Sequence, residues 1–166
     1  STSGLFYGGF SNASGAFTRT ESWDGTSWSE VNDIATGRQG LGGAGANSLS
    51  ALAISGYDNS TNVANVEEWS FSGLDPSTTP AADYADGVVG DFYYNSTTGQ
   101  FKNVFTGVGS WSSGGSLGSG SAGRGAAGPY TASIAFGGTG SPPTANQAIT
   151  ETYDGSSWTE VADLNE

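Results

Sequence analysis

Residues 20–34 read Thr-Glu-Ser-Trp-Asp-Gly-Thr-Ser-Trp-Ser-Glu-Val-Asn-Asp-Ile, and residues 150–164 read Thr-Glu-Thr-Tyr-Asp-Gly-Ser-Ser-Trp-Thr-Glu-Val-Ala-Asp-Leu. Two matched runs of this length in a chain of 166 residues indicate an internal repeat. The repeat decides the architecture, because a short repeated unit can bury its apolar face only against a neighbouring unit.

Three landmarks define the repeat. A tryptophan is followed six residues later by an aliphatic side chain in the pairs Trp28 and Ile34, Trp111 and Leu117, and Trp158 and Leu164. An apolar run closes on glycine at Gly8 and Gly9, at Gly56, and at Gly137 and Gly138. An acidic residue then stands two positions before an aromatic one at Trp23, Trp69 and Tyr153. Short apolar runs bounded by Gly and Asn are typical of strands, and no window has a helical period, so we expect an all-β chain.

The spacing of the landmarks divides the chain into three blades. We expect residues 1–34 to form a partial first blade that lacks its first strand, 35–117 a second blade, and 118–166 a third. Trp69 and Trp111 are 42 residues apart, whereas the corresponding aromatic residues of the other blades are 5 apart. The second blade therefore contains an insertion of about 37 residues, roughly 73–108. Its predicted strands are Leu41–Gly45, Leu49–Ser55, Val66–Phe71 and Ser110–Ser112.

This order of strands resembles the kelch repeat, in which glycines close the second strand, an aromatic residue marks the third and a tryptophan the fourth. The resemblance implies a β-propeller segment of four-stranded antiparallel blades. The second blade departs from the pattern at Ser55, which stands in place of the first glycine of the pair. The third blade has Ser121 where the second has Arg38, and Arg124 comes three residues later. The two arginines therefore occupy different positions of the repeat.

The Asp-Gly-(Ser/Thr)-Ser-Trp runs also look similar to repeats in tail fibres and appendages of marine tailed bacteriophages. Within the insertion, residues 90–104 resemble a short hairpin module of phage fibres, with arms at Phe92–Tyr94 and Gln100–Val104. The resemblance implies a non-enzymatic, extracellular virion appendage that adheres to glycans on the host surface. A purely structural decoration or spacer module that mediates subunit assembly is the alternative.

Composition excludes several classes of function. The chain has 16 acidic and 4 basic residues, a net charge of -12, which repels a phosphate backbone and argues against nucleic acid as a partner. No stretch approaches the roughly 20 apolar residues of a membrane helix, so we expect no membrane insertion. Cysteine and histidine are both absent, which removes disulfides, thiolate zinc sites and the commonest general base. Methionine is absent too, so we expect a processed chain or a piece of a longer one.

We therefore predict no enzyme, no cofactor and no metal. A nucleophilic triad lacks its histidine, and galactose-oxidase-like copper chemistry lacks both Cys and His. Residues 22–28 are similar to the Asp-box of sialidase propellers but are one residue short. Three carboxylates remain as candidates for a glycan hydrolase or a calcium site, although nothing fixes their separation and solvated loop carboxylates are the simpler interpretation. They are Asp83, Asp86 and Asp91.

Glycan recognition by the insertion is more plausible than catalysis, because loops on a rigid scaffold commonly carry binding. Aromatic faces beside amides and carboxylates suit sugar rings. The alternative is that the same aromatic residues pack the hairpin against its own blade or a partner subunit. Tyr93 and Tyr94 are adjacent, so one side chain should point in and the other out. The candidate ligand-binding residues are Tyr84, Asp91, Tyr93, Tyr94, Asn95 and Phe101.

Trp28, Trp111 and Trp158 recur at one repeat position, which favours packing between blades over ligand binding. Glycine runs such as 42–45 and 137–138 are expected to permit close backbone approach or positive φ. The sequence stops at Glu166, where a next unit would begin. The expected partners are therefore further blades of the same parent chain or other copies in a homo-oligomer, together with other virion proteins.

Overall fold

The computed structural model describes residues 3–71, 92–95, 100–103, 109–140 and 145–165. Within these ranges all the regular secondary structure consists of β-strands, which confirms the predicted all-β class. The same ranges contain no helix long and apolar enough to span a membrane. The chain divides into two compact units, one of residues 1–70 with 110–166 and the other of residues 71–109.

The first sheet has three antiparallel strands in the order β1 (Gly4–Tyr7), β4 (Thr20–Trp23) and β5 (Trp28–Val31). Strands β2 (Phe10–Ser11) and β3 (Gly15–Ala16) pair as a small hairpin in the connection between β1 and β4. Among the described residues, no strand pairs with β1 on the side away from β4. One edge of β1 therefore stays available for pairing.

The second sheet has four strands in the order β11-β8-β7-β6. The observed strand ends agree with the predicted strands to within two residues. Strand β7 is central, and its residues 51–54 are all buried because both faces of the strand are covered. The strands are β6 (Gly42–Asn47), β7 (Ser50–Ile54), β8 (Val66–Phe71) and β11 (Gly109–Ser113).

The third sheet repeats this arrangement in the order β12-β13-β14-β15. Its strands are β12 (Gly125–Ala127), β13 (Ile134–Phe136), β14 (Thr150–Tyr153) and β15 (Trp158–Val161). Two four-stranded antiparallel sheets confirm the predicted blade-like sheets. In the other unit, β9 (Phe92–Asn95) pairs antiparallel with β10 (Gln100–Asn103), which confirms a hairpin within the insertion.

Asp-Gly turns join the third and fourth strands of the first and third sheets. Asp24 Oδ1 accepts the backbone N–H groups of Thr26 and Ser27, both at 2.8 Å. Asp154 Oδ1 accepts the equivalent N–H groups of residues 156 and 157 at 2.9 Å. Gly25 and Gly155 have φ values of 100° and 95°, which glycine adopts without strain. Local chemistry therefore fixes these two turns.

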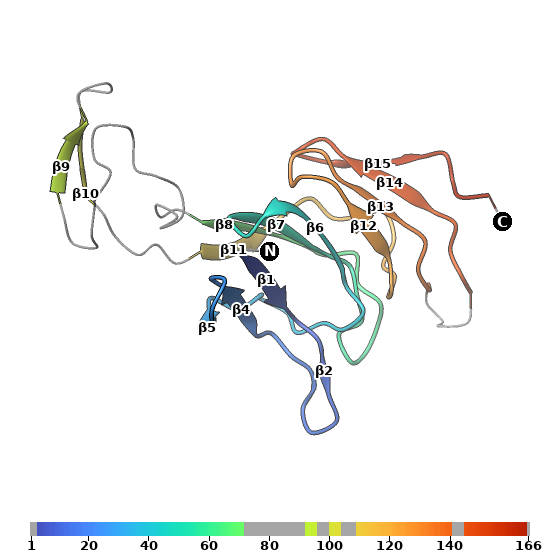
Figure 1. Ribbon diagram of the computed structural model, residues 1–166. Coiled ribbons are helices and arrows are strands. Elements are labelled where there is room, and N and C mark those ends of the chain that lie inside the picture. The colour runs from blue at the N-terminus through green and yellow to red at the C-terminus, as the bar shows by residue number, and fades with distance from the viewer. Residues whose placement is uncertain (1–2, 72–91, 96–99, 104–108, 141–144, 166) are drawn as a thin grey trace. The chain divides into compact units, whose positions relative to one another are not determined.

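The main core lies between the second and third sheets. Strands β6 and β12 run side by side there (Figure 1). A Cβ on Gly42 would lie 3.1 Å from the carbonyl oxygen of Arg124 and 3.2 Å from Cβ of Ala126, so only the smallest residue fits this approach. The buried apolar cluster consists of Ala44, Leu52, Ile54, Val66, Leu117, Ala135 and Tyr153.

Candidate functional site

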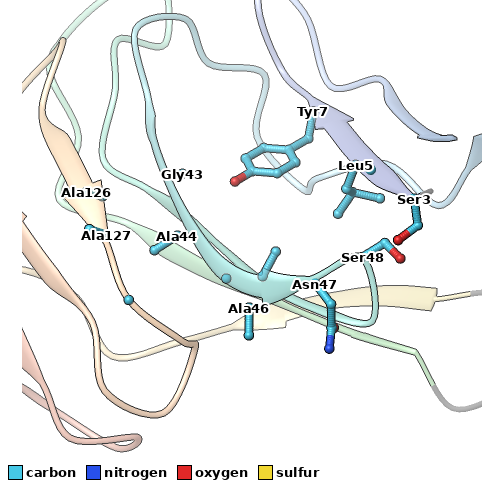
Figure 2. A pocket seen from close by; sticks show the side chains of 14 residues that line it. Ser3, Leu5, Tyr7, Gly43, Ala44, Ala46, Asn47, Ser48, Ala126 and Ala127 are labelled. Carbon is cyan, nitrogen blue, oxygen red and sulfur yellow. The ribbon is translucent and has the colours of Figure 1, made fainter. Parts of the chain in front are cut away.

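A groove of about 540 Å³ runs beside β1, bounded by β6 and β12 (Figure 2). Leu5 and Tyr7 line it from β1, Gly43 and Asn47 from β6, and Ala126 from β12. Strand β1 holds the place in its sheet that β7 and β13 hold in theirs, and those strands are covered by β6 and β12. The groove therefore lies beside the strand of the first sheet that has no pairing partner on the side away from β4 among the described residues.

The edge of β1 away from β4 carries backbone hydrogen-bonding groups. The N–H of Gly8 donates to the carbonyl of Arg19 across the β1–β4 ladder, at 2.9 Å. In an antiparallel pair, alternate residues direct their N–H and C=O groups to opposite sides. The backbone groups of Leu5 and Tyr7 consequently point away from β4. They form a template on which an extended segment can pair.

Tyr7 closes one wall of the groove. Its hydroxyl donates to the carbonyl oxygen of Leu52 at 2.9 Å, and its ring packs edge-on against Trp111 with centroids 4.8 Å apart. Burial raises the pKa of Tyr7 to about 12, so its phenol stays neutral at physiological pH. A Cβ on Gly43 would lie 2.6 Å from the Tyr7 hydroxyl. Tyr7 thus shapes one wall of the groove.

The groove lining consists of Gly, Ala, Ser, Asn, Leu and Tyr, with no carboxylate, guanidinium or ammonium group. Such a lining, taken over the described residues, suits an uncharged or extended ligand. In the part of the chain that the structure describes, no group of three or more Asp or Glu residues is placed to hold a metal ion.

Buried carboxylates serve the junctions between sheets. At the first junction, Glu67 Oε1 accepts from the guanidinium of Arg38 at 2.8 Å, and Oε2 accepts the backbone N–H of Ala35 at 2.7 Å. Both charged side chains are almost fully buried. Burial lowers the pKa of Arg38, and the neighbouring Glu67 opposes that shift. Glu67 therefore joins its own sheet to the segment that leaves the first sheet.

The second junction repeats the arrangement. Glu151 Oε2 accepts from Arg124 at 2.7 Å, and Oε1 accepts the backbone N–H of Gly118 at 2.7 Å. Ala35 and Gly118 each follow the aliphatic landmark of the preceding sheet, so the two bridges are equivalent in the repeat. A buried carboxylate with a paired guanidinium and a backbone donor is satisfied without solvent.

The two arginines reach equivalent carboxylates from different repeat positions. Arg38 lies four residues before β6, whereas Arg124 immediately precedes β12. In the sequence repeat Ser121 lies opposite Arg38, so the sequence does not predict this convergence. Its only trace in the sequence is the glutamate that recurs two residues before each third-strand aromatic residue.

Ser121 and Ser55 form a polar contact of their own between the second and third sheets. The N–H of Ser121 donates to Ser55 Oγ at 2.8 Å, and the N–H of Gly56 donates to the carbonyl of Ser121 at 2.9 Å. Ser55 has a φ of 58°, close to the 62° of Gly8 and the 67° of Gly137 at equivalent positions. Its hydroxyl contacts compensate for a conformation that otherwise favours glycine.

The fourth-strand tryptophans have different surroundings. Trp111 donates from Nε1 to Thr20 Oγ1 at 3.1 Å. Trp158 stacks on Tyr153 with centroids 5.0 Å apart, but its Nε1 is buried and has no hydrogen-bond partner in the described part of the chain. The residue equivalent to Thr20 in the second sheet is Val66, which has no acceptor. Trp28 is 52% exposed.

The predicted ligand-binding residues belong to the unit of residues 71–109. Tyr93, Tyr94 and Asn95 lie on β9 and Phe101 on β10, with Tyr94 opposite Phe101 in the register. Tyr84 and Asp91 lie outside the described residues, as do the carboxylate candidates Asp83 and Asp86. Their role in binding stays a prediction.

The chain matches no protein-family model and no curated protein. Among solved structures it is similar to that of YjhT, a kelch-repeat β-propeller protein, with 18% sequence identity over 87% of this chain and a TM-score of 0.37. The chain spans about half, 52%, of the length of that protein chain. The fold is all-β, and its four-stranded antiparallel sheets resemble propeller blades.

Proposed function

We propose that the chain is a non-enzymatic adhesion module of a tail-fibre-like bacteriophage appendage. In this proposal the kelch-like sheets form a rigid scaffold that displays the segment between β8 and β11 to host-surface glycans. The resemblance of the Asp-Gly-(Ser/Thr)-Ser-Trp runs and of the hairpin to phage fibre sequences supports the phage origin and the virion location.

The observation that carries the proposal is the place where the repeat is interrupted. In the first and third sheets, four residues join the third and fourth strands, at 24–27 and 154–157. In the second sheet, 37 residues, 72–108, separate β8 from β11. The two strands still belong to one four-stranded sheet, so the blade accommodates the long segment. Long segments held by a regular scaffold are typical carriers of binding.

The chemistry of the chain supports a neutral ligand and no catalysis. A net charge of -12 disfavours polyanions, and the hairpin sequence offers aromatic and amide groups. The carboxylates of the repeat already serve packing and turns: Glu67 and Glu151 are buried in ion pairs, and Asp24 and Asp154 cap hairpins.

A glycan array tests the proposal. We expect the 166-residue chain to bind at least one host glycan. A variant in which residues 70–110 are replaced by Asp-Gly-Thr-Ser, the turn that joins Trp23 to Trp28, should lose binding and still unfold cooperatively. Substitutions Tyr93→Ala, Tyr94→Ala and Phe101→Ala should weaken binding, whereas Phe10→Ala, an exposed aromatic on the separate β2–β3 hairpin, should not.

Three outcomes would replace the proposal. Absence of binding to any glycan by the intact chain leaves a structural spacer or decoration module. Equal binding by the variant without residues 70–110 moves the binding site to the sheets. Cleavage of a glycan that is lost on substitution of Asp83, Asp86 or Asp91 makes the chain a hydrolase.

A further inference from the structure

We propose that copies of this chain dock head to tail, joining the first sheet of one copy to the third sheet of another. The contact reproduces the junction that each chain builds between its own first and second sheets. One side is the tryptophan face, defined by Glu21 and Trp28. The other is the leucine face, defined by Phe136, Thr150, Leu164 and the backbone N–H of Asn165.

The tryptophan face lacks the cover that its equivalents have. Trp28 is 52% exposed, whereas Trp111 and Trp158 at the same repeat position are only partly exposed. Each of these two packs toward the sheet that precedes its own: Trp111 on Tyr7, and Trp158 on the cluster that contains Val66. By the same register, the side chain of Trp28 is directed toward the place of a preceding sheet.

The leucine face is the opposite half of such a contact. Ile34 is 2% exposed and Leu117 4% exposed, and each is followed in the chain by a further sheet, whereas Leu164 is 47% exposed. The backbone N–H of Leu164 donates to the carbonyl of Ala148 at 2.9 Å. Ile34 and Leu117 make the equivalent bonds to residues 18 and 64, at 3.1 and 3.0 Å. Leu164 is therefore already held in the position of a junction residue.

Hydrogen-bonding groups on the two faces match. Trp111 donates to Thr20 Oγ1 and packs on Tyr7 at the internal junction. The leucine face has Thr150 at the position of Thr20 and Phe136 at the position of Tyr7; Thr150 is 5% exposed, so its hydroxyl lies just below the surface of this face. The indole N–H of Trp28 from another copy would thus meet a hydroxyl and an aromatic ring. The internal junction at Trp158 is less complete, because Val66 offers no acceptor.

A carboxylate and a backbone donor complete the match. Glu67 and Glu151 each accept the N–H of the residue that follows an aliphatic landmark. Glu21 holds the same repeat position on the tryptophan face, and Asn165 follows Leu164 on the leucine face. No arginine lies within ion-pair distance of Glu21 among the described residues. Docking gives this carboxylate the backbone donor that its two equivalents have.

The two faces differ, so the contact is heterologous: each copy uses a different surface toward each neighbour. An isologous dimer would place Trp28 against Trp28 and leave Thr150 unused. This distinction gives the proposal a direct test, because complementary variants can rescue each other only across a heterologous contact.

Sedimentation velocity over a concentration series measures the contact. We expect the 166-residue chain to form dimers or larger species as its concentration rises. Trp28→Asp and Leu164→Asp should each leave a monomer, because each places an uncompensated charge in the contact. Mixing the two variants should restore a dimer, since each retains one intact face. Thr150→Val should weaken association roughly tenfold by removing the acceptor for the indole N–H.

Phe10→Asp is the matched control, because Phe10 is 51% exposed on the β2–β3 hairpin and lies on neither face. It should associate like the unchanged chain. Thermal unfolding of the monomeric variants should stay cooperative, since both substituted side chains are exposed. A monomer at every concentration, failure of the mixed variants to associate, or loss of association in Phe10→Asp would each overturn the proposal.

Discussion

Two junctions join neighbouring sheets, one between the first and second sheets and one between the second and third. Each junction contains a buried carboxylate bridge of the same kind, but the two junctions differ in the surroundings of the tryptophan. In the first, Trp111 donates to Thr20; in the second, Trp158 packs on the cluster that contains Val66, and its N–H has no partner among the described residues. The second junction instead has a bond from the Tyr153 hydroxyl to Glu68.

This difference separates the two roles of the repeated tryptophan. Its ring is kept in place by packing at both junctions, whether or not its N–H is satisfied. The carboxylate bridge is the polar contact that both junctions preserve, even though the arginines arrive from different positions. The largest consequences should therefore follow from the bridge and smaller ones from the indole N–H.

Removing the charge of a bridging carboxylate should have the largest effect. Glu67→Gln and Glu151→Gln each leave a buried guanidinium without its counter-ion, which costs about 3–5 kcal/mol of unfolding free energy. Glu151→Gln should cost more, because Arg124 then retains only Ser119 as an acceptor, whereas Arg38 keeps three carbonyls.

Urea unfolding measures this difference. Glu160→Gln is the control, because Glu160 is exposed and lies directly opposite Glu151 in the β14–β15 register. It should change stability little. If all three substitutions lowered the free energy of unfolding by equally small amounts, the carboxylate bridges would not be what stabilises the junctions.

Removing the hydroxyl of Thr20 should make the first junction resemble the second. Thr20→Val leaves the indole N–H of Trp111 buried without an acceptor, at a cost of about 1–3 kcal/mol. Thr20→Ser keeps the hydroxyl and should recover most of the loss. The penalty should vanish when Thr20→Val is combined with Trp111→Phe, and its persistence there would assign the effect to packing.

The reverse substitution should sharpen the comparison from the other side. Val66→Thr supplies an acceptor beside Trp158 and should raise the free energy of unfolding by about 1 kcal/mol. Burying a hydroxyl at such a site is ordinarily destabilising. The gain should therefore turn into a loss in a Trp158→Phe background. Destabilisation in both backgrounds would show that the hydroxyl does not reach the indole.

The smallest effect should come from the Asp-Gly turns, which are exposed and lie outside both junctions. Hydrogen bonds from the Ser157 and Ser156 groups lower the pKa of Asp154 to about 2, and similar bonds lower the pKa of Asp24. A depressed folded-state pKa means that the contribution is present above about pH 4 and is lost as pH falls toward 2. Asp154→Asn should reduce this acid sensitivity in thermal unfolding, and an unchanged pH profile would contradict the assignment.

Features encoded within a few residues were predictable from the sequence. The Asp-Gly turns and the strands of the second sheet follow from local composition, and the structure places β6 to β8 close to the predicted ranges. The carboxylate bridges were not predictable, because Arg38 and Arg124 align with different residues and meet equivalent glutamates only in three dimensions.

The groove could not be predicted from the sequence either. It depends on the open edge of β1 and on Tyr7, whose hydroxyl reaches Leu52, 45 residues away. Aromatic residues in the insertion could be named as binding candidates from composition. Their arrangement toward a ligand depends on side-chain geometry that no spacing rule supplies.

The two buried ion pairs also determine how the chain responds to salt. They neutralise Arg38 and Arg124, which are two of only 4 basic residues in a chain of net charge -12. Two copies that approach each other therefore meet with a large excess of negative charge and little positive charge to offset it. Because mobile ions screen such repulsion over about 10 Å at 0.1 M ionic strength, head-to-tail docking should tighten as salt is added.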